Sequence, residues 1–160
     1  MPLVGERKPV PVAQTSFDER EGQFSPDGRW VAYVSNETGR DEVYVRPFPA
    51  QGGKSQVSAA GGVDPRWRRD GQELFYVAPD GHLMAVPMQV TQPMSTPTPG
   101  VPVSLFRPRL AIGANATGGW PTRPQYAVAA DGRFLMNVST EDTVTFPITI
   151  VQNWTLAVKK

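Results

Sequence analysis

One unit of sequence occurs three times in this 160-residue chain and limits what the chain can fold into. The copies are FSPDGRWVAYVS, WRRDGQELFYVA and VAADGRFLMNVS, which begin at Phe24, Trp67 and Val128. Each has an Asp-Gly pair, a hydrophobic residue three positions before the aspartate and a strand-like run after the glycine. An Asp-Gly pair provides the positive φ angles of a tight hairpin turn, and its aspartate can accept backbone N–H bonds. We therefore interpret Asp27, Asp70 and Asp131 as turn-forming residues rather than catalytic acids.

The segments on either side of these turns have the composition of short β-strands. They are rich in β-branched and aromatic residues, and Gly, Pro, Asp or Asn bounds them. The strand-like segments are RWVAYVS, DEVYVRPF, KSQVSAA, ELFYVA, HLMAVPM, VPVSLF, PQYAVAA, RFLMNVS and ITIVQNWTLAV. No sustained helical period is present, and the 17 prolines interrupt most candidate helices. The sequence therefore predicts an all-β fold.

The spacing of the repeats predicts the blades of a β-propeller. Asp27 and Asp70 are 43 residues apart, which is a typical period for a four-stranded blade. Asp70 and Asp131 are 61 residues apart, and we assign the difference to an enlarged loop, rich in Pro, Thr and Gly, over 91–123. We expect a single half-propeller domain over 1–160 with three four-stranded blades. The blades are predicted at 18–62, 63–110 and 124–160, although the third unit shows only three evident strands.

These repeats carry a family resemblance. FSPDGRWVAYVSNETGRDEVYVRPFP, followed by WRRDGQELFYVAPDGHLMAVPM, resembles the WD40-like repeats of TolB-like six-bladed β-propellers. The ending PITIVQNWTLAVKK is similar to the C-terminus of the propeller attached to bacterial receptor-type serine/threonine protein kinases. The resemblance implies a six-bladed ring and, in the kinase setting, a sensor or scaffold domain. The chain has no Gly-rich phosphate loop, HRD or DFG sequence, so it does not resemble a kinase catalytic domain.

Three blades cannot close a ring by themselves. Each blade buries both faces against its neighbours, so an arc of three leaves two apolar faces in water. The third unit lacks an outer strand, whereas an unassigned strand-like segment, residues 8–17, precedes the first unit. We expect a two-fold homodimer that closes six blades, with each 8–17 segment exchanged to the partner. A truncated piece with exposed faces is the alternative that the sequence leaves open.

The repeat also predicts a polar site in the central channel. Glu21, Asp64 and Gln125 each lie six residues before the aspartate of an Asp-Gly pair, at the start of an innermost strand. In a two-fold ring these oxygen donors would surround the axis and suit a divalent cation, Ca, Mg, Mn or Zn. A hydrated polar channel mouth without an ion is the alternative interpretation.

Further polar and aromatic residues flank this predicted mouth. Arg20, Arg66, Trp120 and Arg123 are candidates for ligand binding. His82, the one histidine of the chain, joins Glu21 and Asp64 as a candidate catalytic residue, although an exposed turn histidine is the alternative. Trp67, between Arg66 and Arg68, is expected to point into the core between blades.

Composition excludes several classes of protein. The 16 basic and 15 acidic side chains leave a net charge of +1, which argues against binding to nucleic acid or to a membrane surface. The chain has no cysteine, so disulfides and thiolate chemistry are excluded. No membrane span and no signal peptide are predicted. As written, the chain is expected to be soluble and cytoplasmic, or extracytoplasmic if it is a fragment of a longer receptor.

Two functions from different classes fit these features. The first is a binding or interaction module that presents a polar channel and loops to a protein or small ligand. The second is a metal-dependent hydrolase that cleaves lactones, esters or phosphotriesters with a divalent cation at the dimer axis. A non-functional gene fragment that still assembles is a third possibility. Propellers host unrelated activities, so the fold alone does not choose among them.

Overall fold

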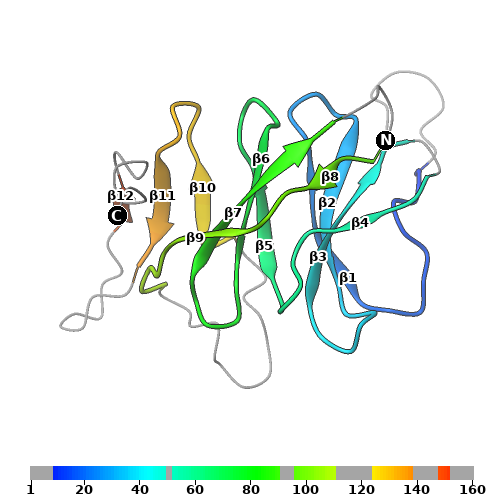
Figure 1. The fold of residues 1–160 in the computed structure, drawn as a ribbon, viewed down its shortest axis with the longest axis horizontal. Helices are drawn as coiled ribbons and strands as arrows, with labels where there is room; N and C mark the ends of the chain where they lie inside the picture. The colour runs from blue at the N-terminus through cyan, green and yellow to red at the C-terminus, as the bar shows by residue number, and fades with distance from the viewer. Residues whose placement is uncertain (1–8, 50–51, 91–95, 111–123, 139–147, 152–160) are drawn as a thin grey trace.

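The computed structural model describes residues 9–49, 52–90, 96–110, 124–138 and 148–151, with the backbone alone for the last range. The described residues form antiparallel β-sheets and contain no helix (Figure 1). This part of the chain confirms the all-β prediction. None of its elements is a helix long and apolar enough to cross a lipid bilayer.

The first sheet is a complete four-stranded blade. It contains β1 (Glu19–Phe24), β2 (Trp30–Ser35), β3 (Glu42–Pro47) and β4 (Ser55–Gln56) in that spatial order. The outer strand β4 is short, but Val57 continues its ladder by donating its N–H to the Val43 carbonyl at 2.8 Å. Neighbours in the chain are thus neighbours in the sheet, as expected for one repeat.

The second sheet has its outer strand divided into two. Its first three strands are β5 (Val63–Trp67), β6 (Glu73–Val77) and β7 (Leu83–Gln89). The end of β7 pairs with β8 (Thr98–Pro99), and its start pairs with β9 (Val103–Phe106). The residues between β8 and β9 are Gly-Val-Pro, and a proline has no N–H for a ladder. The predicted strand segment VPVSLF is therefore confirmed as β9, and β8 is an additional short strand within the predicted loop over 91–123.

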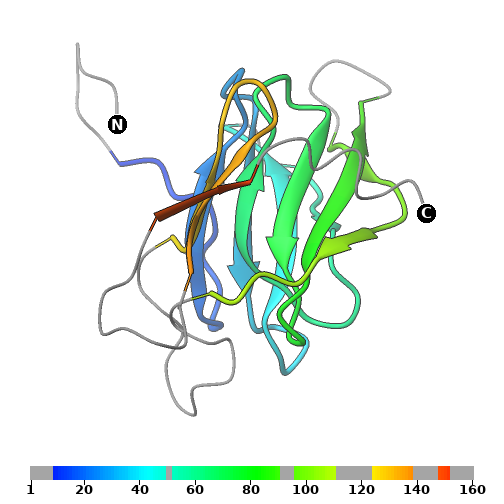
Figure 2. The ribbon, with the colours of Figure 1, turned by 90° about the vertical axis from the view of Figure 1, so that its left-hand side faces the viewer.

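The third sheet has three strands in the described part of the chain: β10 (Tyr126–Val128), β11 (Phe134–Asn137) and β12 (Ile148–Val151). The prediction of three four-stranded blades is thus confirmed in full for the first blade alone. Residues 9–18 form no strand with the sheets of their own chain. Figure 2 views the molecule with the third sheet nearest the reader.

The three Asp-Gly turns connect the first and second strand of each sheet and lie at one end of the molecule (Figure 1). Their glycines have positive φ angles of 71°, 72° and 83°. Each aspartate accepts the backbone N–H of the residue two positions later, at 3.0 to 3.2 Å. The structure therefore confirms that Asp27, Asp70 and Asp131 form turns.

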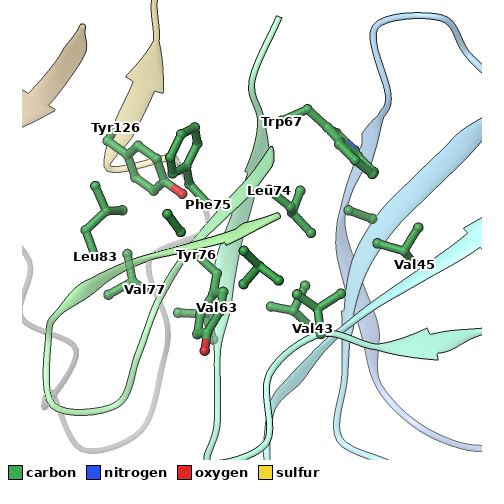
Figure 3. Close-up of a cluster of buried hydrophobic side chains, with 14 of the residues drawn as sticks. Val43, Val45, Val63, Trp67, Leu74, Phe75, Tyr76, Val77, Leu83 and Tyr126 are labelled. Carbon is green, nitrogen blue, oxygen red and sulfur yellow. The ribbon is translucent and has the colours of Figure 1, made fainter. Parts of the chain in front are cut away.

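The sheets stack face to face, and β5 of the middle sheet contacts both β1 and β10. The core lies between the sheets and includes Trp67, which points toward the first sheet, and Phe75, which points toward the third (Figure 3). The Phe75 and Phe134 rings meet edge to face, with centroids 5.0 Å apart. A middle sheet covered on both faces is the arrangement of a propeller blade, so the three sheets are blade-like and their packing is propeller-like. The aromatic side chains buried on the strands are those of Trp30, Tyr33, Tyr44, Trp67, Phe75, Tyr76, Tyr126 and Phe134.

Candidate functional site

A row of polar residues crosses the starts of the inner strands. Glu21 lies on β1, Asp64 on β5, and Gln125 directly before β10. The Asp64 N–H donates to Glu21 Oε2 at 2.6 Å, and the Gln125 N–H donates to Asp64 Oδ2 at 2.9 Å. Each carboxylate therefore binds the backbone of its repeat counterpart in the next sheet. We call these three residues, together with Arg20 and Arg66, the inner-strand row.

Two members of the row hold a backbone conformation that side chains seldom adopt. Glu21 has a φ of 58° and Asp64 a φ of 56°, both in the left-handed region. The pairing registers of β1 with β2 and of β5 with β6 shift at these points, as in a β-bulge. Such a conformation costs about 1–3 kcal/mol per residue, and the carboxylate–amide bonds between sheets offset part of it. The bulges aim both carboxylates at the next inner strand.

Arginines neutralise the carboxylates of the row. Arg66 Nη2 lies 2.6 Å from Asp64 Oδ1, and its guanidinium lies over the Tyr126 ring at 5.8 Å. Arg20 bridges Asp18 at 2.7 Å and Asp41 at 2.5 Å, and its Nε lies 3.8 Å from Glu21 Oε1. The Arg20 and Arg66 side chains are 24% and 11% exposed, and together with the two carboxylates they form a strip of alternating charge.

Burial perturbs the two carboxyl groups of the row. It raises the pKa of Glu21, an effect that the Asp64 N–H opposes and the Asp64 carboxylate reinforces. Burial likewise raises the pKa of Asp64, against the opposing effects of Arg66 and the Gln125 N–H. A raised carboxyl pKa means that the folded chain binds protons more readily than the unfolded chain does. The stabilisation is full below the ordinary carboxyl pKa of about 4 and is lost as the pH rises through the raised value.

We therefore expect the Glu21→Gln variant to gain stability relative to the wild-type chain as the pH rises from about 4 to 7. Urea unfolding at several pH values measures this difference. Asp27→Asn is the opposite control: burial acts to raise the pKa of Asp27, but bonds from Ser25 and Arg29 outweigh it and lower the pKa. As the pH rises, Asp27→Asn should lose stability relative to the wild-type chain mainly below about pH 4, and from about 4 to 7 its offset from the wild-type chain should stay level. Parallel curves for Glu21→Gln and the wild-type chain would contradict the expectation.

The row does not fit a divalent cation well. The described residues contain no group of three His, Cys, Asp or Glu side chains that could hold a metal. An arginine accompanies each of the two carboxylates, and a cation would have to compete with that positive charge. A cation on Glu21, Asp64 and Gln125 therefore stays a prediction.

The other predicted site residues lie apart from the row or outside the described residues. His82 occupies the β6–β7 turn, where its N–H donates to Asp80 Oδ1 and its Nδ1 lies 3.0 Å from Asp80 Oδ2. Its side chain is partly exposed, which agrees with the turn interpretation. Trp120 and Arg123 fall outside the described residues, so their assignment to ligand binding stays a prediction.

Sequence reasoning missed one buried charged residue. Glu42, at the start of β3, is fully buried. Its carboxylate accepts hydrogen bonds from Gly61 N–H at 3.0 Å, from Ser58 Oγ, and from Arg40 Nε at 2.7 Å. These contacts hold the connection from β4 to β5. The repeat offered no signal for it, because the counterpart of Glu42 in the second sheet is His82.

Comparison with known proteins gives a likeness in fold. No family model matches the chain, and no curated protein matches it in sequence. The crystal structure of the tricorn protease is similar over 77% of this chain, with 12% identity and a TM-score of 0.47. The crystal structure of TolB from Acinetobacter baumannii is similar over 87% of this chain, with 14% identity and a TM-score of 0.40. The chain spans 11% and 42% of those two proteins, respectively.

Proposed function

We propose that this chain is a binding module that uses the inner-strand row to hold a protein, a peptide or a small ligand. The observation that carries the proposal is the left-handed backbone of Glu21 and Asp64. Strained conformations of non-glycine residues concentrate at functional sites, and β-bulges commonly re-aim side chains there. Here the strain recurs at the same repeat position and builds one continuous polar strip.

The charges of the row favour a ligand with an acidic group. Arg20 Nη1 pairs with Asp18, whose side chain is 62% exposed. A carboxylate from a ligand can take the place of Asp18 without breaking the more buried pair of Arg20 with Asp41. Arginine presents several N–H donors in a fixed plane, which suits a carboxylate partner. Arg20 is therefore the proposed point of contact.

The family resemblance supports the same class of function. In a protein like the receptor-type kinases, such a propeller would be a sensor or scaffold domain. The hydrolase alternative would need a metal or an activated nucleophile. No observation of the described residues favours either of these.

Peptide selection tests the proposal. A phage-displayed library of random linear peptides is selected on the purified chain. The selected peptides are synthesised, and calorimetry measures the affinity of the chain for each of them. We expect the selected peptides to contain Asp or Glu. Arg20→Ala should lower the affinity for these peptides by roughly tenfold. Arg20→Lys, which keeps the charge, should lose less. Arg29→Ala is the matched control, because Arg29 pairs with Asp27 in a turn between β1 and β2.

Two outcomes would overturn the proposal. One is a selection that enriches no peptide with an acidic residue. The other is an Arg20→Ala variant that binds the selected peptides as tightly as the wild-type chain does. Thermal unfolding of each variant, followed by circular dichroism, separates a loss of binding from a loss of fold.

A further inference from the structure

The two ends of the stack of sheets each expose an apolar side chain that is buried elsewhere in the repeat. Phe24 of β1 is 56% exposed, whereas its register counterpart Trp67 is 9% exposed. Leu135 of β11 is 43% exposed, whereas its counterpart Phe75 is fully buried. These two repeat positions are therefore covered wherever a neighbouring sheet packs on them.

The exposed face of the third sheet is hollowed. A shallow depression of about 490 Å³ lies over β10 and β11. Its lining residues are Pro124, Gln125, Tyr126, Ala127, Leu135, Met136 and Asn137. This face of the third sheet is turned toward the viewer in Figure 2. On the middle sheet the corresponding face is filled, because Phe75 packs against Phe134 of the next sheet.

We propose that a second copy of this chain fills this hollow with its Phe24, so that two chains close one ring of six blades. Propellers have about 4 to 8 blades, and six is the one multiple of three in that range. Two identical contacts then close the ring about a two-fold axis and cover both end faces. This inference stands apart from the binding function proposed above.

The internal contacts between sheets show what the new interface would contain. Trp67 donates its Nε1–H to the Gln23 carbonyl on the preceding inner strand, at 3.2 Å. Phe24 holds the same repeat position, and the counterpart of Gln23 in the third sheet is Ala127, which lines the hollow. Phe24 of the second copy would therefore pack on Ala127 as Trp67 packs on Gln23.

The hydrogen bonds of the inner-strand row extend in the same way. Glu21 accepts the Asp64 N–H, and Asp64 accepts the Gln125 N–H. The next member of this series is the backbone N–H of Glu21 in the second copy. The side-chain oxygen of Gln125 is the acceptor at the matching repeat position. Closure would thus join the two rows into one strip around the ring.

The segment before β1 fits the remaining edge. The 43-residue period places the counterpart of the outer strand β4 at residues 12–13. Residues 9–18 form no strand in their own chain, and Val10 and Phe17 are 48% and 47% exposed. The third sheet has no strand beyond β12 among the described residues. In the closed ring this segment would supply the outer strand of the partner's third blade.

Light scattering coupled to size-exclusion chromatography tests the stoichiometry. We expect twice the 17.5 kDa chain mass for the wild-type protein and for Val101→Asp, a control at an 81% exposed position of the middle blade. Phe24→Asp should give the mass of one chain, because it places a charge in the apolar hollow. A wild-type mass of one chain, or of any assembly other than two, would overturn the proposal.

Cross-linking tests whether the two faces meet, with small uncharged substitutions in place of the charge that Phe24→Asp introduces. The natural chain has no cysteine, so Phe24→Cys and Leu135→Cys together provide the two reactive thiols. A short bismaleimide should link this double variant into a product of two chains and no larger species. A ladder of longer products would indicate an open filament, and no product would indicate that the faces do not meet. Either result would overturn the proposal.

Discussion

Replacing Phe75 with alanine is expected to lower the free energy of unfolding by about 4 kcal/mol, since removal of a buried aromatic side chain leaves a cavity. Phe75 is fully buried between the second and third sheets, and its ring meets Phe134 at 5.0 Å. Urea unfolding followed by tryptophan fluorescence measures the loss. All variants are compared at one protein concentration, because association would make the apparent stability depend on it.

A double-mutant cycle identifies the contact responsible. Phe134→Ala should lower the free energy of unfolding by a similar amount, because Phe134 is also fully buried. The double variant should lose less than the sum by about 0.5–1.5 kcal/mol, the value of an aromatic pair. Val101→Ala should change stability by less than about 0.5 kcal/mol, because Val101 is exposed. A loss below about 1 kcal/mol for Phe75→Ala would mean that the third sheet does not pack on the second.

The fold could be predicted because the spacing of turn and apolar residues in the sequence reports backbone geometry directly. The Asp-Gly pairs fixed where each hairpin turns, and the alternation of apolar residues placed Trp67 and Phe75 in the core. The division of the outer strand in the second sheet was not predicted. The outer strand of the second sheet divides at a Gly-Val-Pro segment, where one proline is enough to interrupt the ladder.

The site residues at equivalent repeat positions could be predicted from the sequence, and the other features of the site could not. Counting back from each Asp-Gly pair gave Glu21, Asp64 and Gln125, which the structure brings into one row. The left-handed backbone and the arginine pairing depend on bulges that composition does not reveal. The burial of Glu42 was not predicted because a charged residue at the start of a strand is usually exposed. Here a loop from the same blade covers it.

Glu42→Ala is expected to lower the free energy of unfolding by about 3 kcal/mol. The Glu42 carboxylate is fully buried and accepts bonds from the Gly61 N–H and the Ser58 hydroxyl. Alanine would leave both donors without these bonds, and each unsatisfied buried group costs about 1–3 kcal/mol. Ser58 Oγ also accepts the Val43 N–H at 2.8 Å, so the loss should spread to β3. Urea unfolding measures the total effect.

Amide hydrogen exchange then shows where the effect of Glu42→Ala arises. The Gly61 amide should lose protection first, because its acceptor is removed, while amides near the Asp27 turn should not change. Glu42→Gln keeps one oxygen acceptor and should lose less stability. Glu19→Ala is the control, since Glu19 accepts one hydrogen bond, from the exposed Thr15. If Glu42→Ala behaved like Glu19→Ala, Glu42 would not hold the connection between the first two blades.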